Sequence, residues 1–232
     1  MTHTRSEFRA GTLAGLPFIL VIAPFGAVFG VVATEAGLDV AQVMGFSFLV
    51  IAGAAQFVAL QMMVENAPVL IVLAASLAVN LRMAMYSAAL APHLGRLSFA
   101  RRALVAYVLV DQTFAAASLR YEQTPPRTAT QKMAFFLGVS APVVPVWYVA
   151  TWAGAVLGSA VPPGLPIDFA VPITFLALIV PMLRSAAHVV AALVSIIGVL
   201  VFAFMPYNTG LLVAALLAMI AGAETERRMA AR

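Results

Sequence analysis

The sequence contains no cysteine and a single lysine among its 232 residues, and only 9% of its residues are charged. The absence of cysteine excludes disulfides, thiol catalysis and cysteine-based metal sites. A soluble domain typically carries about 25% charged residues, well above this value. With 63% hydrophobic residues and a mean hydropathy of +1.03, the chain is predicted to be a multi-pass membrane protein.

The chain also lacks a hydrophilic stretch long enough for a separate soluble domain, so we predict one transmembrane domain over residues 1–232. Its basic residues are scattered over loops and ends, which indicates membrane topology rather than a surface that binds polyanions. The sequence has no H-E-x-x-H motif, no glycine-rich phosphate loop and no cluster of His and carboxylates with ligand spacing. We therefore predict no metal, no cofactor and no nucleic-acid partner.

Eight apolar runs follow one another along the chain, and each is a candidate for a membrane helix. The sequence predicts an all-α, polytopic membrane helix bundle with seven or eight helices, several of them interrupted by proline or glycine. The fourth run lies at the lower limit of length for crossing a bilayer. The runs are 12–33, 43–64, 68–91, 103–119, 133–158, 168–183, 188–205 and 209–223.

Arginine and lysine in the loops predict the orientation, because they favour the cytoplasmic side. Arginines near both ends place both termini inside, which eight spans satisfy. Loop 120–132 then lies inside and the acidic loop 34–42 outside. Loop 92–102, with one histidine and three arginines, breaks the pattern. Either this loop is an exception, or an earlier segment enters and leaves the membrane by the same face.

Proline and glycine are frequent inside the runs, and Pro24 and Gly26 lie in the first one. A proline removes one helical hydrogen bond, which is tolerated in a membrane where protein or a wet cavity satisfies the freed carbonyl. Gly26-x-x-x-Gly30 is also a pattern for close helix packing. Two interpretations stay open: kinked helices that pack closely, or discontinuous helices at a substrate site.

Arg82 and Asp111 are the two charged residues that lie well inside apolar runs. In an antiparallel hairpin of consecutive runs they would lie at similar depths, at about 1.5 Å of rise per residue. One interpretation is a structural ion pair that fixes the helix register. The other is a substrate or proton site, because ionisable groups inside membranes are usually functional.

Other polar residues accompany this pair. Tyr86 lies one helical turn after Arg82 and shares its helix face, and Asn80 lies in the same run. Thr113 flanks Asp111. Gln56, which follows Gly53 in the second run, is either a packing contact between helices or a ligand contact.

A catalytic interpretation has little support. Gly138-x-Ser140 and His188 superficially resemble an intramembrane serine protease, which needs a serine beside a general base. However, His188 lies at the boundary of a run, and G-x-S occurs a second time at 45–47. We therefore predict no catalytic residues and no enzyme activity.

Several stretches together resemble the AzlC family, the large subunit of bacterial branched-chain amino acid exporters. The similarity extends from about residue 9 to 223 and is strongest from 45 to 120. The matching residues are Pro24-Phe25-Gly26 with Gly30, Ala52-Gly53-Ala54-Ala55-Gln56-Phe57, Asn80-Leu81-Arg82 with Tyr86-Ser87, Ala91-Pro92-His93-Leu94, Asp111 with Thr113-Phe114, Gly138 and Trp152.

This resemblance implies a multi-pass protein of the bacterial inner membrane that exports branched-chain amino acids, driven by the proton-motive force, with a small AzlD-type membrane subunit. Many relatives carry Asp-Glu where this chain has Asp111-Gln112, so proton coupling here would fall to Asp111 alone. The expected substrate or proton-coupling residues are Asn80, Arg82, Asp111, Gln56, Tyr86 and Thr113, with helix breaks near the site at Pro24, Gly26 and Gly53.

Physical reasoning is consistent with this function. A zwitterion with a short aliphatic side chain needs a cationic contact, an anionic or carbonyl contact and an apolar pocket. Arg82, Asn80 or the N-termini of broken helices can meet the carboxylate, and Asp111 or freed carbonyls the ammonium. Alternatively, Asp111 carries the proton and releases Arg82 when protonated. The remaining alternatives are a channel or a transporter of another small solute, and a purely structural subunit.

Overall fold

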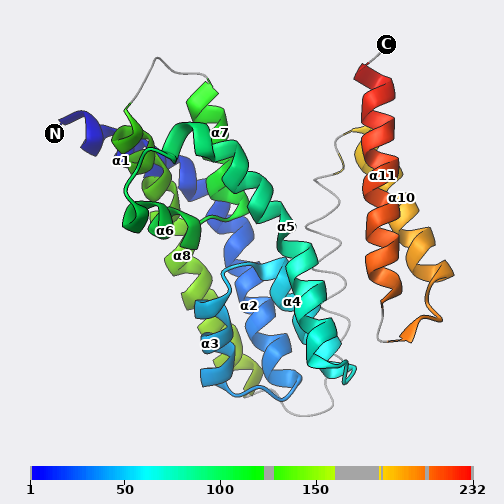
Figure 1. Ribbon diagram of the computed structural model, residues 1–232. Helices are drawn as coiled ribbons and strands as arrows, with labels where there is room; N and C mark the ends of the chain where they lie inside the picture. The colour runs from blue at the N-terminus through cyan, green and yellow to red at the C-terminus, as the bar shows by residue number, and fades with distance from the viewer. Residues whose placement is uncertain (1, 123–127, 160–182, 184, 207–208, 231–232) are drawn as a thin grey trace. The chain divides into compact units, whose positions relative to one another are not determined.

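The computed structural model describes residues 2–122, 128–159, 183, 185–206 and 209–230, and the regular structure in these ranges is helical. The chain divides into two compact units, which we describe separately (Figure 1). The first unit is Met1–Phe57 with Val79–Leu165, and the second is Val58–Ala78 with Pro166–Arg232. The expectation of a single domain remains a prediction.

The helices follow the apolar runs, with two interruptions that divide a run into two short helices. The helices are α1 (Thr2–Gly15), the 3-10 turn η1 (Leu16–Phe18), α2 (Ile19–Glu35), α3 (Val40–Leu49), α4 (Gly53–Val64), α5 (Val69–Leu94), α6 (Phe99–Tyr107), α7 (Asp111–Glu122), α8 (Ala129–Ser159), α10 (Ala186–Val201) and α11 (Gly210–Ala230). The predicted run 168–183 lies almost wholly outside the described residues.

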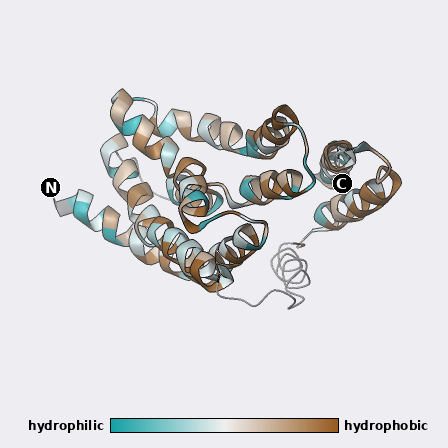
Figure 2. Ribbon diagram, turned by 90° about the horizontal axis from the view of Figure 1, so that it is seen from below, coloured by the Kyte–Doolittle hydropathy of each residue, from teal (hydrophilic) through white to brown (hydrophobic). Residues whose placement is uncertain are grey.

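Within the described ranges, three helical segments are long and apolar enough to cross a membrane: His3–Glu35, Val69–Leu94 and Ala129–Ser159. Large apolar side chains are exposed along the helices, such as Leu20, Leu70 and Leu200, each at least 72% exposed. Hydrophobic residues predominate along the ribbons in Figure 2. The regular structure of the described residues is helical, so the all-α class is confirmed. The apolar exterior suits a lipid environment and is consistent with a membrane helix bundle.

Glycines hold α2 against α8. A methyl group added at Gly30 or Gly154 would overlap backbone atoms of the facing helix, and at Gly26 it would lie 3.1 Å from the Trp147 carbonyl oxygen. The helix α2 continues through Pro24 and Gly26, so the predicted breaks at these two residues are wrong. The packing interpretation is the correct one here, because small residues let the two backbones approach closely.

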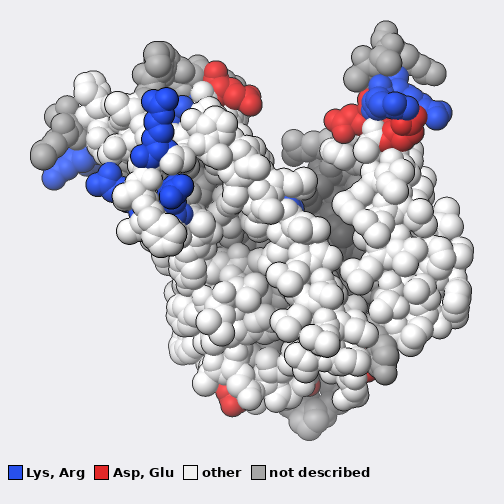
Figure 3. Space-filling model, in the orientation of Figure 1, with Lys and Arg blue, Asp and Glu red and all other residues white. Residues whose placement is uncertain are grey.

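The two ends of the first unit differ in charge. At the basic end, the Arg120 Nη2 atom of α7 lies 3.7 Å from the Glu7 Oε1 atom of α1, and Lys132 Nζ of α8 lies 2.8 Å from His93 Nδ1 of α5. At the acidic end, where α2 ends at Glu35, the last turn of α8 packs on the last turns of α2. Figure 3 shows lysine and arginine gathered where the N-terminus lies.

The helices α6 and α7 form a hairpin that enters the first unit and returns to the same end. α6 starts shortly after α5 ends at the basic end, and Tyr107, its last residue, reaches Tyr148 in the middle of α8. α7 then runs beside α5 in the same direction. Its Phe114 ring stacks on Tyr86, and its Tyr121 ring lies 5.1 Å from the His93 ring at the basic end.

The helices α3 and α4 fold back in the same way from the acidic end. α3 begins with Asp39, whose side chain accepts a hydrogen bond from the Gln42 N–H in a capping box. It descends to Phe48, whose ring lies 4.4 Å from that of Tyr148. α4 starts with Gly53 against Phe25 and continues to Phe57, which contacts both Phe25 and Phe29. It therefore runs in the direction of α2, back towards the acidic end.

Helix lengths agree with this fold. α3, α4, α6 and α7 have 10, 12, 9 and 12 residues. At about 1.5 Å of rise per residue each reaches about half of a bilayer core of about 30 Å. The fourth run, expected as a span of 103–119, is thus two half-length helices. Loop 92–102 follows α5 at the end of the first unit where Arg120 of α7 lies beside Glu7 of α1. This arrangement agrees with the alternative in which an earlier segment, here α3 and α4, enters and leaves the membrane by the same face.

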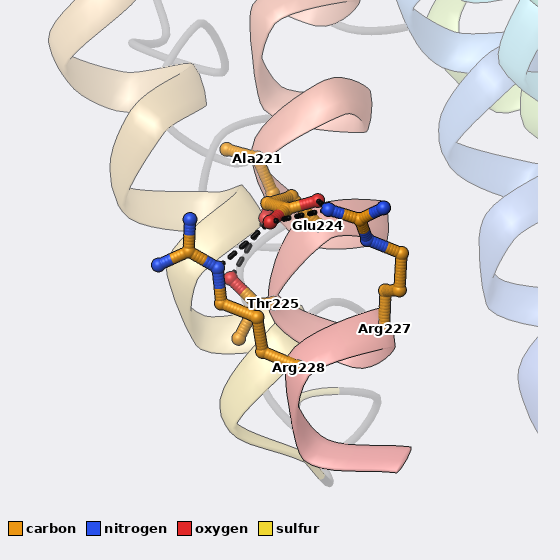
Figure 4. Close-up of polar contacts among 5 residues, drawn as sticks. All are labelled: Ala221, Glu224, Thr225, Arg227 and Arg228. Atoms are coloured by element: carbon orange, nitrogen blue, oxygen red, sulfur yellow. Dashed lines mark hydrogen bonds and ion pairs between the residues drawn. The ribbon is translucent and has the colours of Figure 1, made fainter. Parts of the chain in front are cut away.

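In the second unit, α10 packs on α11 through small residues. A methyl group at Gly198 of α10 would lie 2.9 Å from the Ala214 Cβ atom of α11. Beyond its apolar part, α11 ends in a charged turn (Figure 4) in which Glu224 accepts hydrogen bonds from Arg227 and Arg228 at 3.1 and 2.7 Å. These hydrogen bonds, with the Arg227 bond as the largest cause, lower the pKa of the Glu224 carboxyl.

Candidate functional site

An ion pair joins the tip of the α6–α7 hairpin to α5. The Arg82 Nη1 atom lies 3.1 Å from Asp111 Oδ2, and the Tyr86 hydroxyl donates a hydrogen bond of 3.0 Å to Asp111 Oδ1. Both carboxylate oxygens therefore have a donor. Arg82 and Tyr86 act together because residues four apart share a helix face, as the sequence predicts.

The expected pairing of Arg82 with Asp111 is present, but the expected geometry is wrong. The two helices run in parallel, since α6 carries the chain into the unit before α7 turns back. Arg82 and Asp111 lie at nearly equal distances along the chain from the ends of their helices, at Leu94 and Glu122. At about 1.5 Å per residue both lie about 16–18 Å from the basic end, near the centre of a bilayer core.

Three features stabilise the Asp111 charge at this depth. Arg82 neutralises it, Tyr86 donates a hydrogen bond, and Asp111 is the first residue of α7, where the helix dipole favours an anion. The pair is still partly open, because the side chains of Arg82 and Asp111 are 28% and 42% exposed. A neutral but accessible pair can exchange partners or take up a proton.

Two buried side-chain atoms of α5 have no hydrogen-bond partner among the described residues: Arg82 Nε, within the pair, and Asn80 Oδ1, two residues earlier on the helix. A buried polar atom without a partner costs about 1–3 kcal/mol. The Arg82 guanidinium therefore has an unused donor for a further polar group. Tyr86 is held in place by its ring, which stacks on Phe114 with a centroid separation of 4.1 Å.

Thr113 shapes the hairpin tip instead of facing the ion pair. Its fully buried Oγ1 accepts a hydrogen bond of 2.9 Å from the Val110 N–H, and it lies 2.9 Å from the Val110 carbonyl oxygen and 3.3 Å from that of Val108. The Val110 N–H is a donor that a helix leaves unsatisfied where it starts, whereas the Val110 carbonyl also accepts a hydrogen bond from the Phe114 N–H. Thr113 thus holds the start of α7, and with it Asp111.

Gln56 lies at the other tip. It is fully buried in the first turn of α4, and its Nε2 donates a hydrogen bond of 3.1 Å to the Ser47 hydroxyl in the last turn of α3. The amide therefore bridges the break at residues 50–52. Gly53, the predicted break, is the first residue of α4, and a methyl group there would lie 2.7 Å from the Phe25 ring and 2.9 Å from that of Trp147.

The two hairpin tips meet. The Tyr107 hydroxyl, at the end of α6, donates a hydrogen bond of 2.9 Å to the Phe48 carbonyl near the end of α3, and its oxygen lies 2.9 Å from the Tyr148 hydroxyl of α8. The Phe48 carbonyl needs such a partner because α3 ends one residue later and provides no N–H for it. Tyr107, Tyr148 and Ser47 were not among the residues predicted for the site. The helix-start signal Asp-x-Thr at 111–113 could have revealed the break between α6 and α7.

The described residues contain no group of three or more His, Asp or Glu that could hold a metal ion. The features together define a class: a helical membrane protein in which two half-length hairpins enter from opposite ends, and one of them, α6–α7, forms an ion pair with α5 at mid-depth. Discontinuous helices with polar residues at their tips are typical of secondary transporters.

Comparison with known proteins gives the family. A family model described as "AzlC protein" matches residues 17–161, and the chain belongs to this family. The family is associated with branched-chain amino acid transport. The matched segment contains both hairpins and the Arg82–Asp111 pair, so the resemblance seen in the sequence is confirmed.

Relatives agree with a membrane location. The chain is 28% identical over 206 residues to "Inner membrane protein YgaZ" of Escherichia coli (strain K12), with 85% of this chain and 83% of that protein covered. An "Uncharacterized membrane protein" of Archaeoglobus fulgidus is 28% identical over 220 residues, covering 90% and 91%. No solved structure matches the chain. The expected inner-membrane location is confirmed by homology to an inner membrane protein. The long apolar helices of this chain agree with that location.

Proposed function

We propose that the protein is a secondary transporter that exports branched-chain and other small apolar amino acids, coupled to the proton-motive force and assembled with a small membrane subunit. The observation that carries the proposal is the Arg82–Asp111–Tyr86 cluster at mid-depth, on the tip of a hairpin that enters from the basic end. Membership of the AzlC family supports the substrate class and the partner subunit.

The proposed coupling uses the proton affinity of Asp111. Protonation removes the carboxylate charge, breaks the ion pair and releases Arg82, while deprotonation restores the pair. Gln112, the next residue along the helix, has an amide side chain and cannot take up a proton. Because basic residues favour the cytoplasmic side, we assign the basic end, including loop 92–102, to the cytoplasm. With this assignment, the α6–α7 hairpin enters from the cytoplasmic side and the α3–α4 hairpin enters from the opposite side.

Uptake of labelled leucine into inverted vesicles, with the small subunit co-expressed, tests this proposal. Uptake in the wild type is expected to require a proton gradient and to collapse with a protonophore. Asp111→Asn is expected to insert normally but to lose gradient-driven uptake, because the amide cannot take up a proton. Asp39→Asn is the matched control, since asparagine also caps a helix well. Full, pH-independent uptake by Asp111→Asn contradicts the coupling.

A further inference from the structure

The break between α3 and α4 contains a buried acceptor with no partner. The Gln56 side chain is fully buried, and its Nε2 is fixed on Ser47 across the break. Its Oε1 has no hydrogen-bond partner among the described residues. Since the amide is already oriented by Ser47, the carbonyl oxygen is held in one position, ready to accept a hydrogen bond from a ligand.

The same turn supplies donors. The first N–H groups of a helix have no acceptor within that helix. In α4 the first intrahelical bond runs from the Gln56 N–H to the Ala52 carbonyl, which leaves those of Gly53, Ala54 and Ala55 outside the helical ladder. No acidic residue lies in this first turn, whereas α7 starts with Asp111. The positive end of the α4 dipole therefore lacks the carboxylate that the α7 dipole has.

Aromatic rings cover this turn on its apolar side. Four rings form a closed cycle, with centroid separations of 5.1 Å (Phe25–Phe57), 5.3 Å (Phe57–Phe29), 6.3 Å (Phe29–Trp147) and 5.9 Å (Trp147–Phe25). Gly53 allows the rings of Phe25 and Trp147 to lie directly against the start of α4. A short aliphatic side chain next to this turn would lie against aromatic carbon.

We propose that the α3–α4 break is the head-group subsite for the amino acid. The free N–H groups of the first turn of α4 bind the carboxylate, the Gln56 carbonyl oxygen accepts from the ammonium, and the four-ring cycle contacts the aliphatic side chain. The inference rests on the proposed export of amino acids and deepens it. It assigns the carboxylate to α4 and not to Arg82, because Arg82 already has Asp111 as its anion.

The arrangement divides the work between the two tips, which touch through Tyr107 and the Phe48 carbonyl. One tip is uncharged and can receive a zwitterion without a competing carboxylate. The other carries the carboxylate that titrates. Since the tips are in contact, a change of charge at Asp111 can alter the position of α3 and so the access to the subsite.

Binding of labelled leucine to the full chain with its small subunit in nanodiscs tests the subsite. Two analogues separate the head groups: 4-methylpentanoate lacks the ammonium and 3-methylbutylamine lacks the carboxylate. Gln56→Met, which keeps the volume but removes the acceptor, is expected to weaken leucine at least tenfold while competition by 4-methylpentanoate stays unchanged. Gln61→Met, the same change at an exposed position of α4, is the matched control and is expected to bind leucine like the wild type.

Ala54→Pro tests the donors, because proline near a helix start removes an N–H without breaking an intrahelical bond. It is expected to weaken leucine and 4-methylpentanoate about tenfold and to leave 3-methylbutylamine unchanged. Ala100→Pro, at the same position of the exposed start of α6, is the matched control. If folded Gln56→Met and Ala54→Pro bind leucine like the wild type, the subsite is refuted although export stands. If the wild type binds no branched-chain amino acid, the proposed function fails as well.

Discussion

The two hairpins have nearly the same build but different chemistry at their tips. Each begins with a helix-capping residue type, Asp39 or Ser98, stops after 9 or 10 residues, and restarts for 12. In one, α2 supplies the aromatic rings of Phe25 and Phe29 to the tip. In the other, α5 supplies Arg82 and Tyr86 to Asp111. The same backbone solution therefore serves an uncharged tip and a charged one.

The contrast teaches what a charge at mid-depth requires. Asp111 has a cation, a phenol and a helix start around it, whereas the first turn of α4 contains no acidic residue and therefore no carboxylate that needs such partners. The two hairpins also enter from opposite ends, so a substitution in each of them tests a different side of the membrane. Four substitutions follow that break or sharpen this comparison, ordered by expected effect.

Removing one partner of the ion pair has the largest expected effect. Asp111→Ala leaves Arg82 without its anion at mid-depth, and we expect gradient-driven leucine uptake to fall at least a hundredfold. Stability should also fall, by about 1–3 kcal/mol, less than for a fully buried pair because the site is partly exposed. Thermal unfolding of Arg82→Ala, Asp111→Ala and the double variant measures the coupling; strictly additive losses would contradict a direct pair.

Copying the charged tip onto the neutral one is the next test. Ala54→Asp places a carboxylate in the first turn of α4, as in α7, where it occupies the N–H groups proposed for the substrate. We expect leucine uptake to fall about tenfold and thermal stability to fall as well, because the new carboxylate has the helix dipole but no cation beside it. Ala54→Asn, which has nearly the same size but no charge, is the matched control. Unchanged uptake by Ala54→Asp would show that this turn does not meet the substrate carboxylate.

Loosening the charged tip should have a smaller effect. Thr113→Val keeps the volume but removes the hydroxyl that accepts from the Val110 N–H, and helix caps of this kind contribute about 1 kcal/mol. We expect the melting temperature to fall by a few degrees and the dependence of uptake on pH to shift, because Asp111 is held by the same turn. Ser118→Ala, on the same helix, serves as the control.

Separating the two tips is expected to have the smallest effect. Tyr107→Phe removes the hydrogen bond to the Phe48 carbonyl and the contact with Tyr148. A hydrogen bond of this kind contributes about 1 kcal/mol to stability. We expect stability to fall by that amount and leucine binding to stay within a few-fold of the wild type. Tyr148→Phe, which leaves the Phe48 contact in place, should destabilise less. An equal effect of the two variants would place the important contact between the tyrosines.

A pH effect is expected outside both hairpins, at the end of α11. The Glu224 pKa is lowered in the folded state from its ordinary value of 4.5. Its contribution to stability is therefore complete above that unfolded value and is lost as the pH falls through the lower folded value. Protection of the last turn of α11 against hydrogen exchange, relative to the intrinsic exchange rate at the same pH, should decrease as the pH falls below this ordinary value in the wild type. Glu224→Gln should remove this dependence; an unchanged profile would show that the carboxylate pairs weakly in solution.

Much of the fold follows from composition and periodicity. Within the described residues the apolar runs coincide with helices, although the first helix starts at Thr2, well before run 12–33, and α11 continues beyond run 209–223. The two opposite charges in neighbouring runs predict their contact. The hairpins could not be predicted in this way, because run 43–64 is as apolar as a full span and nothing in hydropathy marks the break at 50–52. The misplaced basic loop at 92–102 and the helix-start signal Asp-x-Thr at 111–113 were the signs that a segment turns back.

Site residues could be predicted where a single side chain is energetically costly in a membrane. They could not be predicted where their role depends on how the helices pack. Arg82 and Asp111 are conspicuous because a charge in lipid needs a partner. Pro24 and Gly26 looked like breaks, yet α2 continues through both, since close packing on α8 explains the glycine. The partner of Gln56, Ser47, lies across a break that the sequence did not reveal. The contact of Thr113 with Val110, which holds the tip, could not be predicted from its position beside Asp111.

Site-directed labelling tests the central claim, that residues 99–122 enter and leave by one face. The chain has no cysteine, so single-cysteine variants need no other change. Arg96→Cys precedes α6 and Thr128→Cys follows α7, and both are treated with a membrane-impermeant maleimide in inverted vesicles and in intact cells. We predict that both react in inverted vesicles and neither in intact cells. Labelling of the two positions from opposite sides would show that the segment crosses the membrane, and would contradict the hairpin.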